Sequence, residues 1–143
     1  MGKIISYGMQ TVNFWAVLVA GIVNMAVGMV WYGPLFGKLW KNLMGFTDES
    51  MKSMKLSPAY AMTGGLITAL VMAYVLGHFI LLTNAVGLNG AWQLAFYVWL
   101  GFMATVSLGG VLWEGKSLKL VLLNTAEQLV SVFLMAVVLV WWR

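Results

Sequence analysis

The chain has 143 residues, of which 62% are hydrophobic and only 8% are charged, and its formal net charge is +4. A soluble domain is about half apolar and about a quarter charged, so this composition predicts an integral membrane protein. With no cysteine and a single histidine, the chain offers no disulfide framework, no thiol nucleophile and no cysteine-based metal site. We therefore expect no metal and no cofactor.

The first hydrophobic stretch follows a short polar lead, Met1 to Gln10, which contains Lys3. Residues 11–32 are apolar and numerous enough to cross a bilayer as a helix, and they are predicted to form the first membrane helix. Gly33 and Pro34 come next. They are expected to break that helix, because proline has no amide donor.

The connection over residues 33–57 mixes basic and apolar residues. Its first half has an apolar face at helical spacing opposite Lys38 and Lys41, which predicts an amphipathic segment lying in the membrane interface. Thr47 is suited to cap a second short turn, with Asp48 and Glu49 where the helix dipole favours acids. The residues of the apolar face are Leu35, Phe36, Leu39, Trp40 and Leu43.

Three further membrane helices are predicted, over residues 58–83, 91–113 and 117–142. Pro58 suits the first position of a helix, and residues 84–90 end in Asn-Gly, which is typical of a tight turn. The connection at 114–116 is so short that the last two helices must form an antiparallel hairpin. The predicted fold is all-α: one domain over residues 1–143, an integral membrane four-helix bundle of two helical hairpins.

The basic residues are distributed unevenly about these four helices. Only Lys3 and Arg143 accompany the chain ends, whereas six lysines fall in or beside the connections 33–57 and 114–117. Cytoplasmic loops carry an excess of basic residues, so both connections are predicted to be cytoplasmic and both termini to lie outside the cytoplasm. The six are Lys38, Lys41, Lys52, Lys55, Lys116 and Lys119.

Small residues recur at every fourth position on three of the predicted helices. In lipid, helices associate by close backbone packing along such residues, because no hydrophobic drive between helices remains. We expect the three small faces to pack around the polar residues of the fourth helix. They are Ala16, Ala20, Asn24 and Gly28 on the first helix, Gly65, Ala69, Ala73 and Gly77 on the second, and Gly101, Thr105 and Gly109 on the third.

The fourth predicted helix carries polar residues in its middle. They are spaced i, i+3, i+4 and i+7 and therefore share one helix face: Asn124, Glu127, Gln128 and Ser131. A charged group facing lipid costs at least about 2.5 kcal/mol, so this face is predicted to look into the bundle or an oligomer interface, with Asn24 at about the same depth. Glu127 is then either a proton or cation site or a polar contact that holds helices together.

One segment matches a phosphate-binding loop in its letters only. Residues 110–117 fit G-x-x-x-x-G-K-[ST], but that motif needs a preceding strand and a flexible loop, whereas this segment ends a predicted membrane helix. We expect no nucleotide and, with the lysines accounted for by topology, no nucleic-acid partner. No combination of nucleophile, base and orienting residue is visible, so the chain is not expected to be an enzyme.

Three segments carry a family resemblance. The most specific is Trp31-Tyr-Gly-Pro-Leu-Phe-Gly-Lys-Leu-Trp40, and the others run from Val71 to His78 and from Leu112 to Gly115. With them, nearly the whole chain resembles the bacterial membrane-protein family called domain of unknown function 1761. The resemblance implies a small multi-span protein of the bacterial inner membrane, and it implies no activity and no catalytic residue.

Two functions remain open at this point. A chain of 143 residues is too small to enclose a solute path alone, so a transport role would need symmetric association. The first hypothesis is an oligomeric small-solute or proton-coupled permease centred on Glu127. The second is a structural or accessory subunit without chemistry. The expected partners are the lipid bilayer and either further copies of the chain or another membrane protein.

Overall fold

Every regular element in the described part of the chain is a helix. The computed structural model describes residues 11–143, so the polar lead Met1 to Gln10, with Lys3, lies outside the described residues. Two of the elements, marked η, are π-helical turns. In chain order the elements are α1 (Phe14–Val30), η1 (Trp31–Leu35), α2 (Gly37–Met44), α3 (Asp48–Lys52), α4 (Pro58–Thr83), α5 (Gly87–Val98), η2 (Trp99–Ala104), α6 (Thr105–Glu114) and α7 (Leu118–Trp141).

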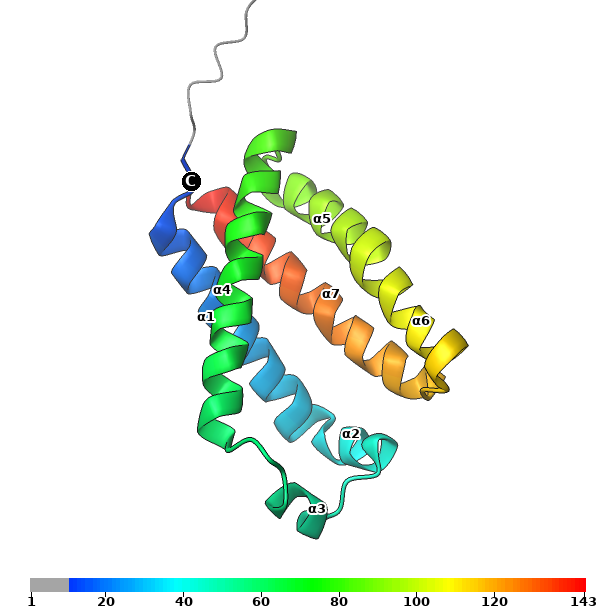
Figure 1. The fold of residues 1–143 in the computed structure, drawn as a ribbon. Coiled ribbons are helices and arrows are strands. Elements are labelled where there is room, and N and C mark those ends of the chain that lie inside the picture. Colours follow the sequence, from blue (N-terminus) through cyan, green and yellow to red (C-terminus); the bar gives the residue numbers. More distant parts are fainter. Residues whose placement is uncertain (1–10) are drawn as a thin grey trace, which may run out of the picture.

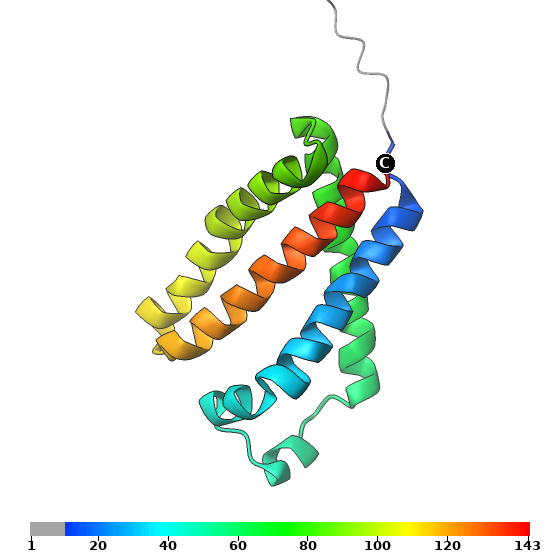
Figure 2. The ribbon, with the colours of Figure 1, turned by 180° about the vertical axis from the view of Figure 1, so that it is seen from behind.

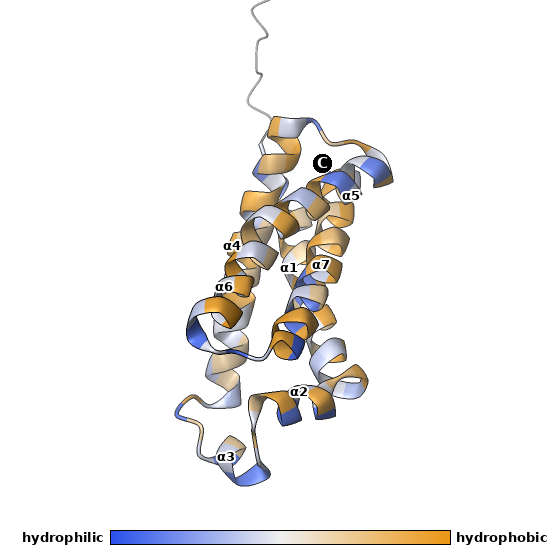
Figure 3. Ribbon diagram, turned by 90° about the vertical axis from the view of Figure 1, so that its right-hand side faces the viewer, coloured by the Kyte–Doolittle hydropathy of each residue, from blue (hydrophilic) through white to orange (hydrophobic). Residues whose placement is uncertain are grey.

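Four continuous helical stretches are long and apolar enough to cross a membrane: Phe14–Leu35, Pro58–Thr83, Gly87–Glu114 and Leu118–Trp141. The shortest has 22 residues and is about 33 Å long, slightly more than a hydrocarbon core of about 30 Å. Hydrophobic residues dominate these stretches, while hydrophilic ones gather in the connections, on α2 and α3, and in a band on α7 (Figure 3). The predicted all-α class with four membrane-length helices is confirmed.

The first span does not break at Gly33 and Pro34 as the sequence predicts. It continues through η1, with Pro34 inside the turn, and the chain changes direction at Phe36, where φ is −125°. The Phe36 amide donates to the carbonyl of Trp31, five residues earlier, at 2.8 Å. Proline interrupts the α-helical ladder because it has no N–H, and the wider π turn absorbs the interruption without ending the helix.

The third span also begins earlier than predicted, at Gly87 instead of residue 91. Asn84 ends α4 in the left-handed conformation, with φ of 52°, and Gly87 takes φ of 64°. Asparagine and glycine tolerate this region better than other residues. The chain therefore reverses between these two residues, and the Asn89-Gly90 pair, expected to form the turn, lies in the first turn of α5.

Three spans lie side by side, with α7 in the middle (Figure 2). On one side α7 packs against α1, and on the other it packs against α5, η2 and α6, while α4 lies across α1 and α7. The start of α1 and the C-terminus are at one end of this assembly, and α2, α3 and the α6–α7 connection are at the other (Figure 1). The arrangement is more open than the bundle that the sequence predicts.

The small residues of the first two spans do pack closely. Ala20, Ala69 and Ala73 are at most 2% exposed, and a Cβ on Gly77 would lie 2.7 Å from Val12 Cγ1. Gly65 lies beside the Met25 side chain, which a Cβ would meet at 3.4 Å. These contacts join α4 to α1 and to Val12 just before it, as expected from close backbone packing in lipid.

The third small-residue face does not pack within the chain, which corrects the sequence prediction. A Cβ added at Gly101 or Gly109 would meet nothing within 4 Å. Ala91 is fully buried on this span, and Gly109, 18 residues later, would repeat its direction in a regular α-helix. The π turn η2 adds about one residue between them, which changes the direction of Gly109. Gly110 is the buried residue of α6, and a Cβ there would lie 2.9 Å from the Lys116 side chain.

Candidate functional site between α1 and α7

Polar side chains face one another along the contact between α1 and α7. The middle of α7 supplies four, and the first span supplies an amide and a phenol. We call this group the polar seam; its members are Asn24, Tyr32, Asn124, Glu127, Gln128 and Ser131. Because α1 and α7 pack together, the polar seam lies between two helices of the same chain.

Glu127 is the only acid in the four spans apart from Glu114 at a helix end. It is half-buried, and its Oε1 accepts a hydrogen bond of 2.8 Å from the hydroxyl of Ser131, which is 1% exposed. A Cβ on Gly28 would lie 4.0 Å from the same oxygen, so the missing side chain at Gly28 makes room for the carboxyl. Among residues 11–143 the one ion pair joins Lys116 to Glu114, and Glu127 has no basic partner.

Tyr32 closes the end of the seam that lies toward α2. Its hydroxyl donates to Asn124 Oδ1 at 2.9 Å. Tyr32 was not predicted to be a site residue, although it continues the series Asn24, Gly28 at the same spacing of four. Aromatic residues near helix ends are commonly membrane-interface anchors, so the position of Tyr32 did not indicate a role in the site.

The expected neighbours of Glu127 are distributed differently from the prediction. Asn24 is not level with Glu127: its Nδ2 donates to Met135 Sδ at 3.5 Å, about 12 Å of helix rise further along α7. Gly28 occupies the place opposite Glu127, because the two helices are staggered by one turn relative to the expected alignment. Gln128 Oε1 is buried without a hydrogen-bond partner, a condition that costs about 1–3 kcal/mol per group.

Two tryptophans of the spans differ in how their indole N–H groups are satisfied. Trp99, at the start of η2, donates from Nε1 to the Thr125 carbonyl at 2.7 Å, which ties the third span to α7. Trp31 Nε1, at the start of η1, is buried and has no partner. No sequence pattern distinguished these two residues, because the difference depends on the neighbouring helix.

The remaining chemical candidates lie apart from the seam. The segment 110–117 forms the end of α6 and a cap at Gly115, where φ is 68°, and the Lys116 amide donates to the Gly110 carbonyl. His78 Nδ1 is 3.0 Å from the Tyr74 carbonyl of its own helix. Within residues 11–143 no three His, Cys, Asp or Glu side chains gather in a group able to hold a metal ion.

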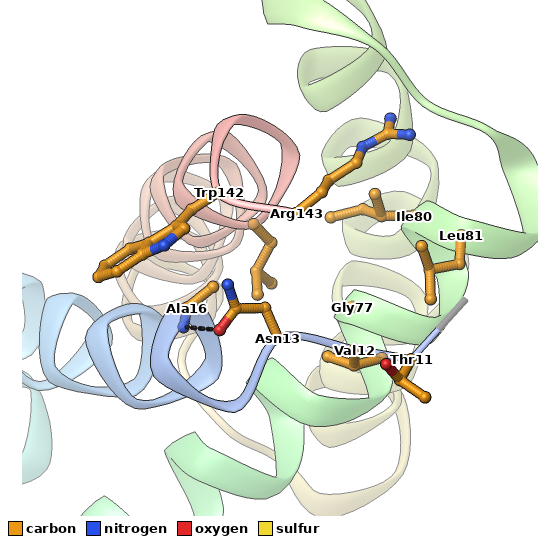
Figure 4. Close-up of a pocket in the computed structure, with 10 residues that line it drawn as sticks. Thr11, Val12, Asn13, Ala16, Gly77, Ile80, Leu81, Trp142 and Arg143 are labelled. Atoms are coloured by element: carbon orange, nitrogen blue, oxygen red, sulfur yellow. Dashed lines mark hydrogen bonds between the residues drawn. The ribbon is translucent and has the colours of Figure 1, made fainter. Parts of the chain in front are cut away.

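Two hollows lie at the end of the molecule near the C-terminus. One, where α1, α4 and α7 meet, holds about 20 Å³ (Figure 4), room for a single water molecule; beside it, the side-chain Oδ1 of Asn13 caps α1 by accepting from Ala16 N at 3.3 Å. The other, of about 550 Å³, is open and lies at the α4–α5 turn, with Gln93 and Tyr97 in its lining. Neither includes Glu127.

The fold and the polar seam define a multi-span α-helical membrane protein with a hydrogen-bonded acid in the middle of a span. The chain belongs to the family described as protein of unknown function (DUF1761), whose model matches residues 15–140, and the predicted resemblance is confirmed. No curated protein and no solved structure matched the chain.

Proposed function

We propose that this protein is an oligomeric, proton-coupled permease for a small solute, with Glu127 as the group that takes up and releases the proton. The observation that carries the proposal is the half-buried Glu127, bonded to Ser131 and without a basic partner in residues 11–143. An acid in the middle of a span is costly unless it is neutral, paired or hydrated. An acid that alternates between proton-bound and proton-free states carries protons through the span, and this role explains its position there. No covalent chemistry is assigned to the chain.

The test uses the proton itself as the probe. Purified protein is reconstituted into vesicles that contain a pH-sensitive dye, and a membrane potential is imposed to drive proton entry. We expect entry above that of empty vesicles, its loss in Glu127→Gln, and its retention in Glu49→Gln, which makes the same change at an exposed acid on α3. Equal proton entry in wild type and Glu127→Gln would refute the proposal.

The proposal places the chain in the bacterial inner membrane with two hairpins, α2 in the interface and both termini outside the cytoplasm. Its support is the lysine excess at the end that holds α2, α3 and the α6–α7 connection (Figure 1), because such excess marks the cytoplasmic side. Ser53 and Asn84 are exposed at opposite ends. In this cysteine-free chain, Ser53→Cys and Asn84→Cys should react with an impermeant thiol reagent from opposite sides; labelling of both from one side would contradict the topology.

A structural or accessory role is the second candidate. It is favoured by Gly101 and Gly109, which face outward: a Cβ added to either would have no atom within 4 Å. Either glycine would let the backbone of another copy, or of another membrane protein, approach closely. Mass measurement in nanodiscs of wild type and Gly101→Leu addresses this role. A multimer that Gly101→Leu dissociates, with no proton entry in either protein, would favour it over the permease.

A further inference from the structure

The helix α2 has the surface of an element that lies on a membrane. It follows the π turn and runs across the end of the spans (Figure 3). Lys38 is exposed on one edge, whereas Leu39, 47% exposed, lies on another, and α2 contains no acidic residue. A helix with basic and apolar edges of this kind places its cations among lipid headgroups and its apolar side chains in the acyl boundary.

The same helix is attached to the polar seam through Tyr32. The Trp40 ring of α2 lies 5.6 Å from the Tyr32 ring, measured between centroids. Gly37 is buried so tightly that an added Cβ would lie 2.7 Å from the Tyr32 carbonyl oxygen. Tyr32 in turn donates to Asn124, three residues before Glu127 on α7. A displacement of α2 must therefore move Tyr32 or break one of these contacts.

We propose that α2 binds anionic lipid headgroups of the adjacent leaflet, and that this binding holds Tyr32 on Asn124 and keeps the near end of the polar seam closed. Lys38 and Lys41 are the groups that recognise the headgroups. An anionic surface attracts each nearby lysine enough to favour the bound state about fivefold. The inference rests on the proposed function for its purpose, but the contacts and their lipid dependence can be measured without any transport.

The experiment measures access to the seam. Gln128→Cys is introduced into this cysteine-free chain, which is reconstituted in vesicles of phosphatidylcholine alone or with phosphatidylglycerol, and the rate of reaction with a small charged thiol reagent is followed from the α2 side. We expect reaction at least about fivefold slower with phosphatidylglycerol. Adding Lys38→Gln and Lys41→Gln should remove this difference, and adding Tyr32→Phe should give fast reaction in both lipids.

The matched control adds Lys52→Gln and Lys55→Gln, which remove the same charge from the neighbouring α3 region, and it should keep the lipid dependence. Equal rates in the two lipids, no reaction in any variant, or an equal effect of the control pair would each overturn the inference. Because the readout is a labelling rate, absence of proton entry would refute the proposed function and leave this result standing.

Discussion

The third and fourth spans are similar in length and hydrophobic character but have opposite surroundings. Within the most apolar stretch of each, 33% of residues are buried in the fourth span and only 11% in the third. The fourth span, α7, lies between its neighbours and carries the polar seam, whereas the third turns Gly101 and Gly109 outward. A row of small residues therefore marks a helix contact only when the helix is rotated to present it.

The largest expected effect separates a buried small residue from an exposed one. Ala73→Leu enlarges a residue that is 0% exposed, so it should lower the free energy of unfolding in mild detergent by about 2–3 kcal/mol through overpacking. Gly101→Leu is the control and should leave the stability of the single chain unchanged or higher. Equal losses in both variants would mean that the third span is also covered within the chain.

A pair of glycine changes tests the same comparison with a smaller perturbation. Gly77→Ala places a methyl group against Val12 Cγ1 and should destabilise the protein by about 1 kcal/mol. Gly109→Ala meets nothing within 4 Å and should stabilise it by about 0.5–1 kcal/mol, because alanine favours the helix. Thermal unfolding of both variants checks the opposite signs, and shifts of the same sign would contradict the assigned rotations.

The attachment of the third span to α7 is tested at Trp99. Trp99→Phe removes the 2.7 Å hydrogen bond to the Thr125 carbonyl and should cost about 1 kcal/mol. Trp113→Phe is the control, since Trp113 is 88% exposed. Limited proteolysis of the α4–α5 turn and thermal unfolding report the loosening; an unchanged Trp99→Phe protein would show that apolar packing alone holds the third span.

The smallest effect concerns the seam itself. Ser131→Ala removes the hydroxyl that donates to Glu127, and hydrogen bonds between side chains in membrane proteins contribute on average about 0.6 kcal/mol. Thr83→Ala is matched, because its hydroxyl donates only to the Phe79 carbonyl of its own helix. The measurement is chemical unfolding in detergent, and a loss above about 2 kcal/mol would indicate that Ser131 has a larger structural role than one bond.

The presence of the four long helices and the all-α fold class could be predicted from composition and local chemistry. The runs of apolar residues, Pro58 at a helix start and the Thr47 cap were all predictable, because each depends on a few neighbouring residues. The polar stripe on α7 was visible for the same reason. Those signals did not reveal the two π turns, since an extra residue in a turn depends on how the helix packs along its whole length.

What the amino-acid sequence determined by itself is an all-α membrane protein of four long helices, with an acid in the middle of the last, because hydrophobicity and helical spacing are properties of single segments. Only the tertiary structure decided the partners. It placed Tyr32 on Asn124 and Asn24 beside Met135, and it turned Gly109 outward. These outcomes depend on the stagger and rotation of one helix against another, which the summed packing of the assembled spans sets.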